Sequence, residues 1–205
     1  MIIHKNLEQG TPEWYMLRLG KLTASDAQAI GNNGKGLETL CLEKVAEKLT
    51  GCIPEQIDNE DIARGRALED EARASYELET GNIVQTVGFV QYDDNIGCSP
   101  DGLIGDDGLI EIKCKNNKNH LLMILGKEID SKYHWQIQGQ IFVTGRKWCD
   151  FVSYNPNFLD MPLKIIRVFP DEKKQAALCE GFAAGNKKIK EILEEIKNVK
   201  SNKKI

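Results

Sequence analysis

The sequence predicts a mixed α/β fold, and three observations support that prediction. In the first third of the chain, apolar residues recur at spacings of three and four, which is the period of an amphipathic helix. The middle then changes to short β-branched or alternating runs separated by turn-forming residues, as expected for neighbouring strands. The C-terminal segment returns to a helical, lysine-rich pattern. We therefore expect helices first, then a sheet, and a closing helix.

The N-terminal part, up to about residue 82, is expected to be helical. Thr23 and Ser25 are residue types that cap the start of a helix, and Gly51 and Gly81 are typical of residues that end one. The expected helices cover residues 14–19, a short segment after Thr23 or Ser25, residues 36–50 and residues 60–80.

The sheet core is expected over about residues 83–170. Residues 105–108, Gly-Asp-Asp-Gly, favour a tight hairpin turn. Three consecutive antiparallel strands are predicted at 84–92, 96–104 and 109–114, followed by a helix at 133–144 and strands at 148–154 and 163–169. A helix over about residues 171–200 closes the chain. The length of 205 residues fits one domain, 1–205.

Composition narrows the function classes. A net charge of −4 argues against a protein that coats nucleic acid indiscriminately, although an enzyme can concentrate positive charge in one groove. The sequence shows neither a cleavable signal nor an apolar run long enough to span a bilayer, so we expect a cytoplasmic protein without membrane contact. The six cysteines include no Cys-x-x-Cys pair, so we interpret them as reduced packing residues rather than metal ligands.

A group of charged residues suited to phosphodiester hydrolysis lies around the third predicted strand. Side chains alternate along a strand, so Glu111 and Lys113 share one face. Asp101 lies ten residues before Glu111, and a hairpin turning at residues 105–108 would bring the two carboxylates together. Carboxylate oxygens bind Mg²⁺, with Mn²⁺ as a substitute, and the metal acidifies water. Lys113 would position and help activate that water, and we expect both carboxylates to face solvent.

The acid-x-lysine triplet alone is weak evidence. It recurs at Asp130/Lys132, Asp171/Lys173, Glu172/Lys174 and Glu195/Lys197. The structural alternative for Glu111 and Lys113 is an exposed ion pair on the face of the sheet. The upstream Pro100-Asp101-Gly102 favours the metal site, because the four other triplets lack such a hairpin partner.

Further short motifs follow one another between about residues 13 and 157. They are Arg18-Leu19-Gly20 with Thr23-Ala24-Ser25, Arg64-Gly65 with Glu69 and Ala72, Ser99-Pro100-Asp101-Gly102-Leu103, Glu111-Ile112-Lys113-Cys114, and Gln136-Ile137-Gln138. With this ordered set the chain resembles the phage lambda exonuclease family, the YqaJ-type viral recombination nucleases of the PD-(D/E)XK superfamily. The resemblance implies a restriction-endonuclease-like core, a central mixed β-sheet flanked by helices, with an N-terminal helical elaboration.

The resemblance also implies roles in the metal site. Asp101 and Glu111 match the metal-binding carboxylates, the backbone carbonyl of Ile112 matches a further ligand, and Lys113 matches the catalytic lysine. Glu69 matches another acid near the metals. It shares a helix stripe with Ile62, Gly65, Ala72 and Tyr76; the alternative is a surface ion pair with Arg66 or Arg73.

A pocket for a terminal 5′-phosphate is implied at Arg18, Ser25 and Gln136. A guanidinium offers phosphate a fork of donors, a serine at a helix start adds a hydroxyl, and glutamine adds an amide. Ser25 can equally be a helix cap. Gln136 and Gln140 are one helical turn apart and can share the cleft, whereas Gln138 faces elsewhere.

The implied activity is 5′-to-3′ exonuclease action on linear double-stranded DNA, which leaves 3′ single strands for phage-type homologous recombination. The implied partners are DNA ends, a single-strand annealing protein and a homotrimer, in the cytoplasm of a bacterial host that carries the phage or prophage. The alternatives are an endonuclease or Cas4-like nuclease of the same superfamily, and an inactive DNA-end-binding protein. A Cas4-like protein would need four cysteine ligands, and the cysteine spacing departs from that pattern.

Overall fold

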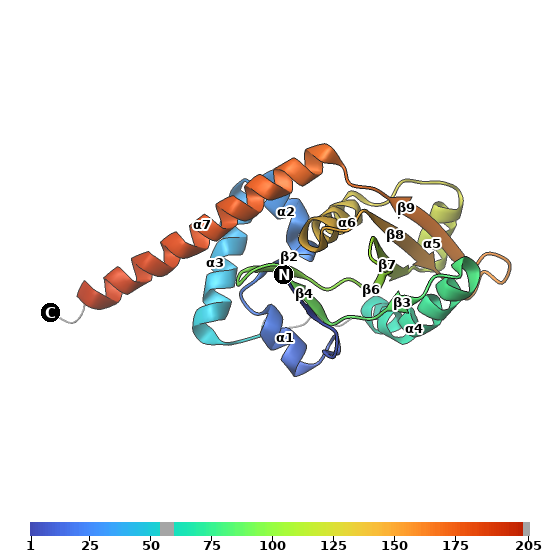
Figure 1. Ribbon diagram of the computed structural model, residues 1–205, viewed down its shortest axis with the longest axis horizontal. Coiled ribbons are helices and arrows are strands. Elements are labelled where there is room, and N and C mark those ends of the chain that lie inside the picture. Colours follow the sequence, from blue (N-terminus) through green and yellow to red (C-terminus); the bar gives the residue numbers. More distant parts are fainter. Residues whose placement is uncertain (54–59, 203–205) are drawn as a thin grey trace.

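The structure is a computed structural model that describes residues 1–53 and 60–202. Within the helices, the side chains of residues 60–62, 200 and 202, and thus Ile62 of the predicted stripe, lie outside the description. Helices surround two small sheets, and the C-terminal helix projects from the body (Figure 1). The described helices are α1 (Pro12–Arg18), η1 (Ala24–Asp26, a 3₁₀ turn), α2 (Ala27–Asn32), α3 (Lys35–Thr50), α4 (Glu60–Thr80), α5 (Asn117–Ile124), α6 (Ser131–Thr144) and α7 (Glu172–Asn202).

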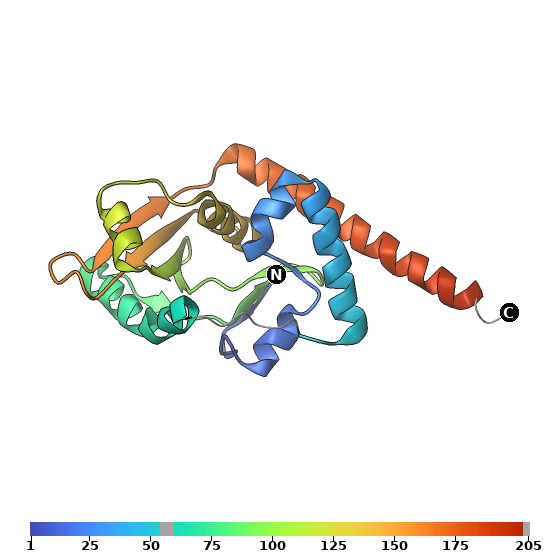
Figure 2. The same cartoon turned by 180° about the vertical axis from the view of Figure 1, so that it is seen from behind.

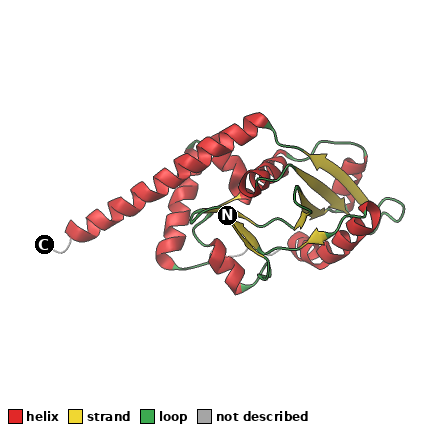
Figure 3. Cartoon of the chain, viewed as in Figure 1, coloured by secondary structure: helices red, strands yellow, loops and turns green. Residues whose placement is uncertain are grey.

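The larger sheet is mixed and has helices on both faces, which confirms the predicted fold class. Its strands β7 and β8 are parallel and the other neighbours are antiparallel. Helix α6 lies over one face and α4 over the other (Figures 1 and 3). The strands are, in spatial order, β3 (Val84–Gln85), β6 (Gly102–Ile104), β7 (Gly108–Cys114), β8 (Trp148–Tyr154) and β9 (Leu163–Val168).

A second sheet of four short strands was not predicted. Its order is β1 (Ile2–His4), β4 (Phe89–Gln91), β5 (Ile96–Cys98) and β2 (Leu22–Thr23). The prediction of three consecutive antiparallel strands is therefore wrong, because segments 84–92 and 96–104 each divide between the two sheets. Gly88 lies at the first break, where an added Cβ would be 2.2 Å from the Leu7 carbonyl oxygen. Pro100 lies at the second break, and proline cannot donate to a strand ladder.

Strand β7 alternates as predicted and thereby defines two cores. Leu109 belongs to the same buried cluster as Ile137 of α6. Ile110 belongs to the other cluster, with Ala72 and Tyr76 of α4. Burying apolar side chains on both faces stabilises the strand in the middle of the sheet, so the polar residues of β7 occupy a fixed position.

Helix α7 packs along α2 and α3 before it extends beyond the body (Figures 1 and 2). The packing is close at Gly181, where an added Cβ would lie 2.0 Å from the carbonyl oxygen of Ile30. Leu178, Phe182 and Ile189 bury their side chains beside it. Among the described helices, none is both long and apolar enough to cross a membrane.

The contact at Gly181 predicts a measurable cost for one added methyl group. Gly181→Ala should lower the free energy of unfolding by about 1–3 kcal/mol, because the new Cβ meets backbone that cannot move freely. Gly65→Ala is the matched control, since a Cβ at this α4 glycine meets nothing within 4 Å and alanine favours a helix by about 1 kcal/mol. Urea denaturation measures both variants. Equal effects of the two substitutions would contradict the α2–α7 contact.

Candidate active site

Asp101 and Glu111 lie side by side because β6 and β7 form a hairpin. Gly102 pairs with Ile110 in this hairpin, so the next residues outward, Asp101 and Glu111, face each other across the end of β6. The backbone amide of Ile112 donates to Oδ2 of Asp101 at 2.6 Å. The hairpin expected from the sequence thus brings the two carboxylates together.

Glu111 is buried rather than solvent-facing, with only 1% of its side chain exposed. Gln136 donates to its Oε1 at 2.7 Å and Gln140 to its Oε2 at 2.6 Å. Both amides come from α6, which covers this face of β7. The expectation of solvent exposure was wrong for Glu111 because β7 is a central strand with a helix above it.

Lys113 contacts the same carboxylate, with 2.5 Å between its Nζ and Oε1 of Glu111. Burial lowers the pKa of Lys113, but the charges of Glu111 and Asp101 outweigh burial and raise this pKa above its usual value. The lysine is therefore a cation at neutral pH. In this arrangement it can orient a water molecule or stabilise negative charge, and it cannot accept a proton.

The surroundings of Asp101 disfavour its charged form, whereas those of Lys113 favour the charged form of the lysine. Burial, followed by the charge of Glu111, raises the pKa of the Asp101 carboxyl well above its ordinary value. A carboxylate in such surroundings is stabilised by any cation that comes close. Negative charge is thus in excess at the end of β6.

Glu69 adds a third carboxylate from α4. Its Oε1 accepts a hydrogen bond from Arg73 at 2.8 Å, which is the ion pair that the sequence left as an alternative. Burial raises the pKa of Glu69, although the charges of Arg73 and Lys113 lower it. Glu69 also lines the same cavity as Asp101, so the ion pair and a place near the metal site are compatible.

The backbone carbonyl of Ile112 points outward from the edge of β7 beside which Asp101 lies. Along a strand, the amide and carbonyl of one residue point to the same side. The Ile112 amide donates to Asp101, whereas the amide of Lys115 donates to Tyr154 of β8 on the other side. The Ile112 carbonyl therefore points to the edge of β7 on which the Asp101 carboxylate lies.

These oxygens fit a hard divalent cation by their chemistry. Carboxylate and carbonyl oxygens are the donors that Mg²⁺ and Mn²⁺ prefer, and burial and the charge of Glu111 raise the pKa of Asp101, so a cation bound there would stabilise its charged form. Residues 1–53 and 60–202 contain no ready-made group of three or more His, Cys, Asp or Glu side chains around one point. The three donors of Glu111 occupy three of about four lone-pair sites of its carboxylate, which leaves one site on Oε2 that can face an ion.

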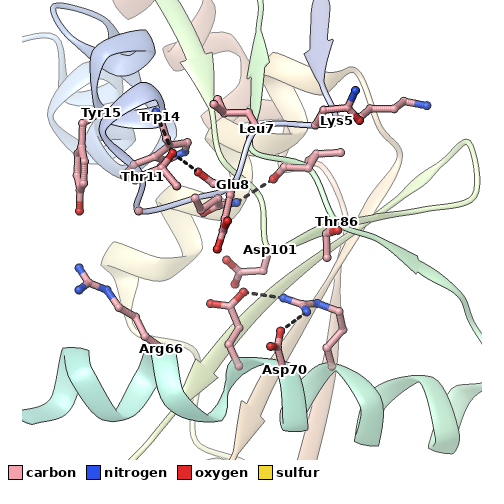
Figure 4. Close-up of a pocket in the computed structure, with 16 residues that line it drawn as sticks. Lys5, Leu7, Glu8, Thr11, Trp14, Tyr15, Arg66, Asp70, Thr86 and Asp101 are labelled. Carbon is pink, nitrogen blue, oxygen red and sulfur yellow. Dashed lines mark hydrogen bonds and ion pairs between the residues drawn. The ribbon is translucent and has the colours of Figure 1, made fainter.

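A cavity of about 850 Å³ opens in front of Asp101, within the usual size range of ligand sites. In Figure 4 the Asp101 carboxylate points into the space between α4, with Arg66 and Asp70, and the N-terminal loop with Thr11. Lys5 and Arg73 add positive charge to its wall. Its wall also carries Glu8, Glu69 and Asp70, so the charge around the cavity is mixed, and the cavity gives a ligand access to Asp101.

The three residues predicted to hold a terminal phosphate make no direct hydrogen bond to one another. Arg18 donates to Oγ of Ser99 at 2.9 Å and lies 4.3 Å above the Trp14 ring. Ser25 is exposed, and its hydroxyl is 2.8 Å from that of Thr23. Thr23 and not Ser25 is the cap of η1. Gln136 contacts Glu111.

Sequence reasoning missed Ser99 and the use of Gln140. Ser99 lies two residues before Asp101 and accepts a hydrogen bond from Arg18. The only sign of this role in the sequence was that Ser99 begins the motif Ser99-Pro100-Asp101-Gly102-Leu103. Gln140 was identified only as a residue that can share the cleft with Gln136. Gln138 turns away, as predicted, and donates to the Phe169 carbonyl at 2.9 Å.

Residues 13–147 match the model of the family described as the YqaJ-like viral recombinase domain. The crystal structure of an alkaline exonuclease, LHK-Exo, from Laribacter hongkongensis is similar to this chain, with 36% sequence identity and a TM-score of 0.84 over 94% of this chain and 99% of that one. A second crystal structure of LHK-Exo, in complex with dAMP, matches equally well. The expected family resemblance is thus confirmed.

A phage-related exonuclease from Haemophilus somnus 129PT shares 14% sequence identity, with a TM-score of 0.65 over 86% of this chain and 96% of that one. At this identity the likeness concerns the fold alone. No curated protein matches the chain.

The raised pKa of Asp101 predicts a pH-dependent gain in stability for Asp101→Asn in metal-free buffer. The unfolded carboxyl titrates near pH 3.9, so the folded wild type loses stability as pH rises from about 4 through the raised pKa. Asparagine avoids this loss, about 1.4 kcal/mol for each unit by which the pKa is raised, and still accepts from the Ile112 amide.

Urea denaturation with EDTA at several pH values between 4 and 8 measures this difference. The variant should gain stability over the wild type as pH rises, and Asp160→Asn, at an exposed aspartate, should show no such trend. A constant difference across this range would contradict the electrostatic account of Asp101.

Proposed function

This chain belongs to the family of YqaJ-like viral recombinase domains, and on that basis we propose that it is a metal-dependent 5′-to-3′ exonuclease acting on linear double-stranded DNA. The family and the alkaline exonuclease it resembles make it a nuclease of phage-type recombination. The observation that supports the catalytic proposal best is the pairing of Asp101 and Glu111 beside Lys113. The single domain 1–205, a homotrimer, an annealing partner and a cytoplasmic location stay predictions.

The proposed metal ligands are Asp101, Glu111 and the carbonyl of Ile112, with Glu69 close by. A bound Mg²⁺ or Mn²⁺ would acidify water and stabilise negative charge on the phosphate. The chain itself contributes orientation. Gln136 and Gln140 hold the Glu111 carboxylate in place, and the cationic Lys113 would orient the attacking water and offset charge on the phosphate oxygens.

The proposed end pocket uses Arg18, Ser25 and Gln136. Arg18 supplies a fixed positive charge. Its guanidinium donates a hydrogen bond to Ser99, and Ser99 lies two residues before Asp101 in the sequence. The exposed hydroxyl of Ser25 and the amide of Gln136 would add neutral donors. An end held in this way would orient the duplex so that a neighbouring phosphodiester meets the carboxylates, which is a positioning effect.

Metal dependence predicts two results that are measured separately. Cleavage should require Mg²⁺ or Mn²⁺, and Mg²⁺ should raise the melting temperature of the wild type but not of Asp101→Asn, because a ligand that binds only the folded state stabilises it. Nuclease assays and melting curves with EDTA or Mg²⁺ provide the readouts. Full cleavage by Asp101→Asn in Mg²⁺ would refute the metal site.

Lys113→Ala should lower the cleavage rate by about 10²- to 10⁴-fold, the range for a group that orients or protonates at the reacting centre. DNA affinity should change far less. Single-turnover rates on a bound, end-labelled duplex separate the two effects. If the variant bound DNA weakly but cleaved bound DNA at the wild-type rate, Lys113 would be a phosphate-binding residue and not a catalytic one.

The end pocket predicts that a 5′-phosphorylated duplex is degraded faster than one ending in a 5′-hydroxyl. Arg18→Ala should remove most of that difference, since it deletes the only fixed charge of the three residues. Gln136→Ala should slow both duplexes, because Gln136 also holds Glu111. Initial rates on matched duplexes, with a closed circle as control, test this. Equal wild-type rates on both ends would refute the pocket, and cutting of the circle would favour an endonuclease.

A further inference from the structure

A smaller cavity of about 260 Å³ lies at the C-terminal end of β7, with Lys113 on its wall. It shares no lining residue with the cavity in front of Asp101. Among the residues that the structure describes, no acidic side chain lines it. The lining residues, which we call the Lys115 pocket, are Arg64, Gly65, Lys113, Cys114, Lys115, Asn116, Asn119 and Tyr133.

The environment of the Lys115 side chain indicates what this pocket can bind. It is half-buried, and its ammonium lies 4.6 Å from the centre of the Tyr133 ring and 5.7 Å from that of Phe151. Within the described part of the chain it forms neither an ion pair nor a side-chain hydrogen bond. Burial and then the charge of Lys113 lower the pKa of Lys115. The charge of Asp130 acts in the opposite direction but does not outweigh these two effects, so an anion bound in the pocket would stabilise the half-buried ammonium.

The other walls supply donors for such an anion. Arg64 of α4 donates to the Cys114 carbonyl at 3.1 Å, which fixes its guanidinium at the pocket. Asn116 and Asn119 contribute side-chain amides from the start of α5. Guanidinium, ammonium and amide groups are the donors that contact phosphate oxygens in protein–DNA complexes. The pocket therefore matches phosphate in charge and in hydrogen bonding.

We propose that the Lys115 pocket binds one phosphate of the DNA strand that occupies the active site. This phosphate differs from the scissile one and from the terminal one assigned to Arg18. Lys113 lies near the end of β7, and Lys115 directly follows this β-strand, two residues and about 6.6 Å further along the extended chain. A DNA strand that passes Lys113 therefore continues directly to Lys115. The proposal rests on DNA being the substrate. The same chemistry would also accept the phosphate of a released mononucleotide.

The first test measures DNA affinity as a function of salt concentration, with EDTA present so that no cleavage occurs. Lys115→Met keeps the apolar stem over the rings and removes the charge. It should reduce the slope of log affinity against log salt by about 1, the effect of losing one phosphate contact. Lys118→Ala is the control, because Lys118 is exposed on α5 and lines neither cavity. An unchanged slope for Lys115→Met, or an equal loss for Lys118→Ala, would overturn the proposal.

The second test locates the phosphate by replacing single phosphates of the strand with uncharged methylphosphonates. One methylphosphonate replacement should weaken DNA binding by the wild type but leave DNA binding by Lys115→Met unchanged. All other replacements should weaken DNA binding by both proteins equally. Identical profiles would refute the contact. If Lys115→Met changed only the competition of added mononucleotide with DNA for binding, the pocket would hold the product and the proposal would fail. These binding measurements omit metal. If the wild type bound DNA in them but did not cleave it in a separate assay with Mg²⁺, the proposed function alone would be refuted.

Discussion

Glu111 is a buried carboxylate in the middle strand of the larger sheet, and three donors surround it. Two of them are amides one turn apart on α6, Gln136 and Gln140, and the third is the ammonium of Lys113. A buried carboxylate is tolerated only when its oxygens are hydrogen-bonded. This requirement fixes the rotation of α6 above β7, so the packing of the helix and the geometry of the site depend on the same contacts.

The second face of the sheet is held in a comparable way. Asp150 on β8 is buried, accepts from the Tyr76 hydroxyl of α4 at 2.6 Å, and accepts two hydrogen bonds from Arg167 at 2.8 Å each. Tyr76 belongs to the helix that carries Glu69. The network thus anchors α4 to the sheet and limits how far Glu69 can move relative to Asp101.

The sequence predicted what depends on local periodicity. The alternation of β7, the hairpin that joins Asp101 to Glu111, and the shared face of Gln136 and Gln140 all follow from spacing along the chain. The break at Gly88 could not be predicted, because it depends on contact with Leu7, far away in the sequence.

Burial of Glu111 also escaped prediction, since a charged triplet in a strand resembles an exposed face when the helix above it is unknown. Helix α5 was missed because its first turn, beginning at Asn117 after the Asn116 cap, is polar and carries no apolar period. The roles of the site residues rest on the family resemblance, since hydrogen bonds show which groups meet but not which bond they break.

The chain passes from the smaller sheet to the larger one through Ser99 and Pro100, and Asp101 follows at once. Arg18 is attached to the first of these residues and the carboxylate pair to the last. The separation between the two attachment points is therefore set by covalent bonds, about 7 Å for two extended residues, and not by the packing of one sheet against the other. Under the proposed function, this short covalent link would keep the Arg18 side chain and the carboxylates in a fixed register along a bound DNA strand.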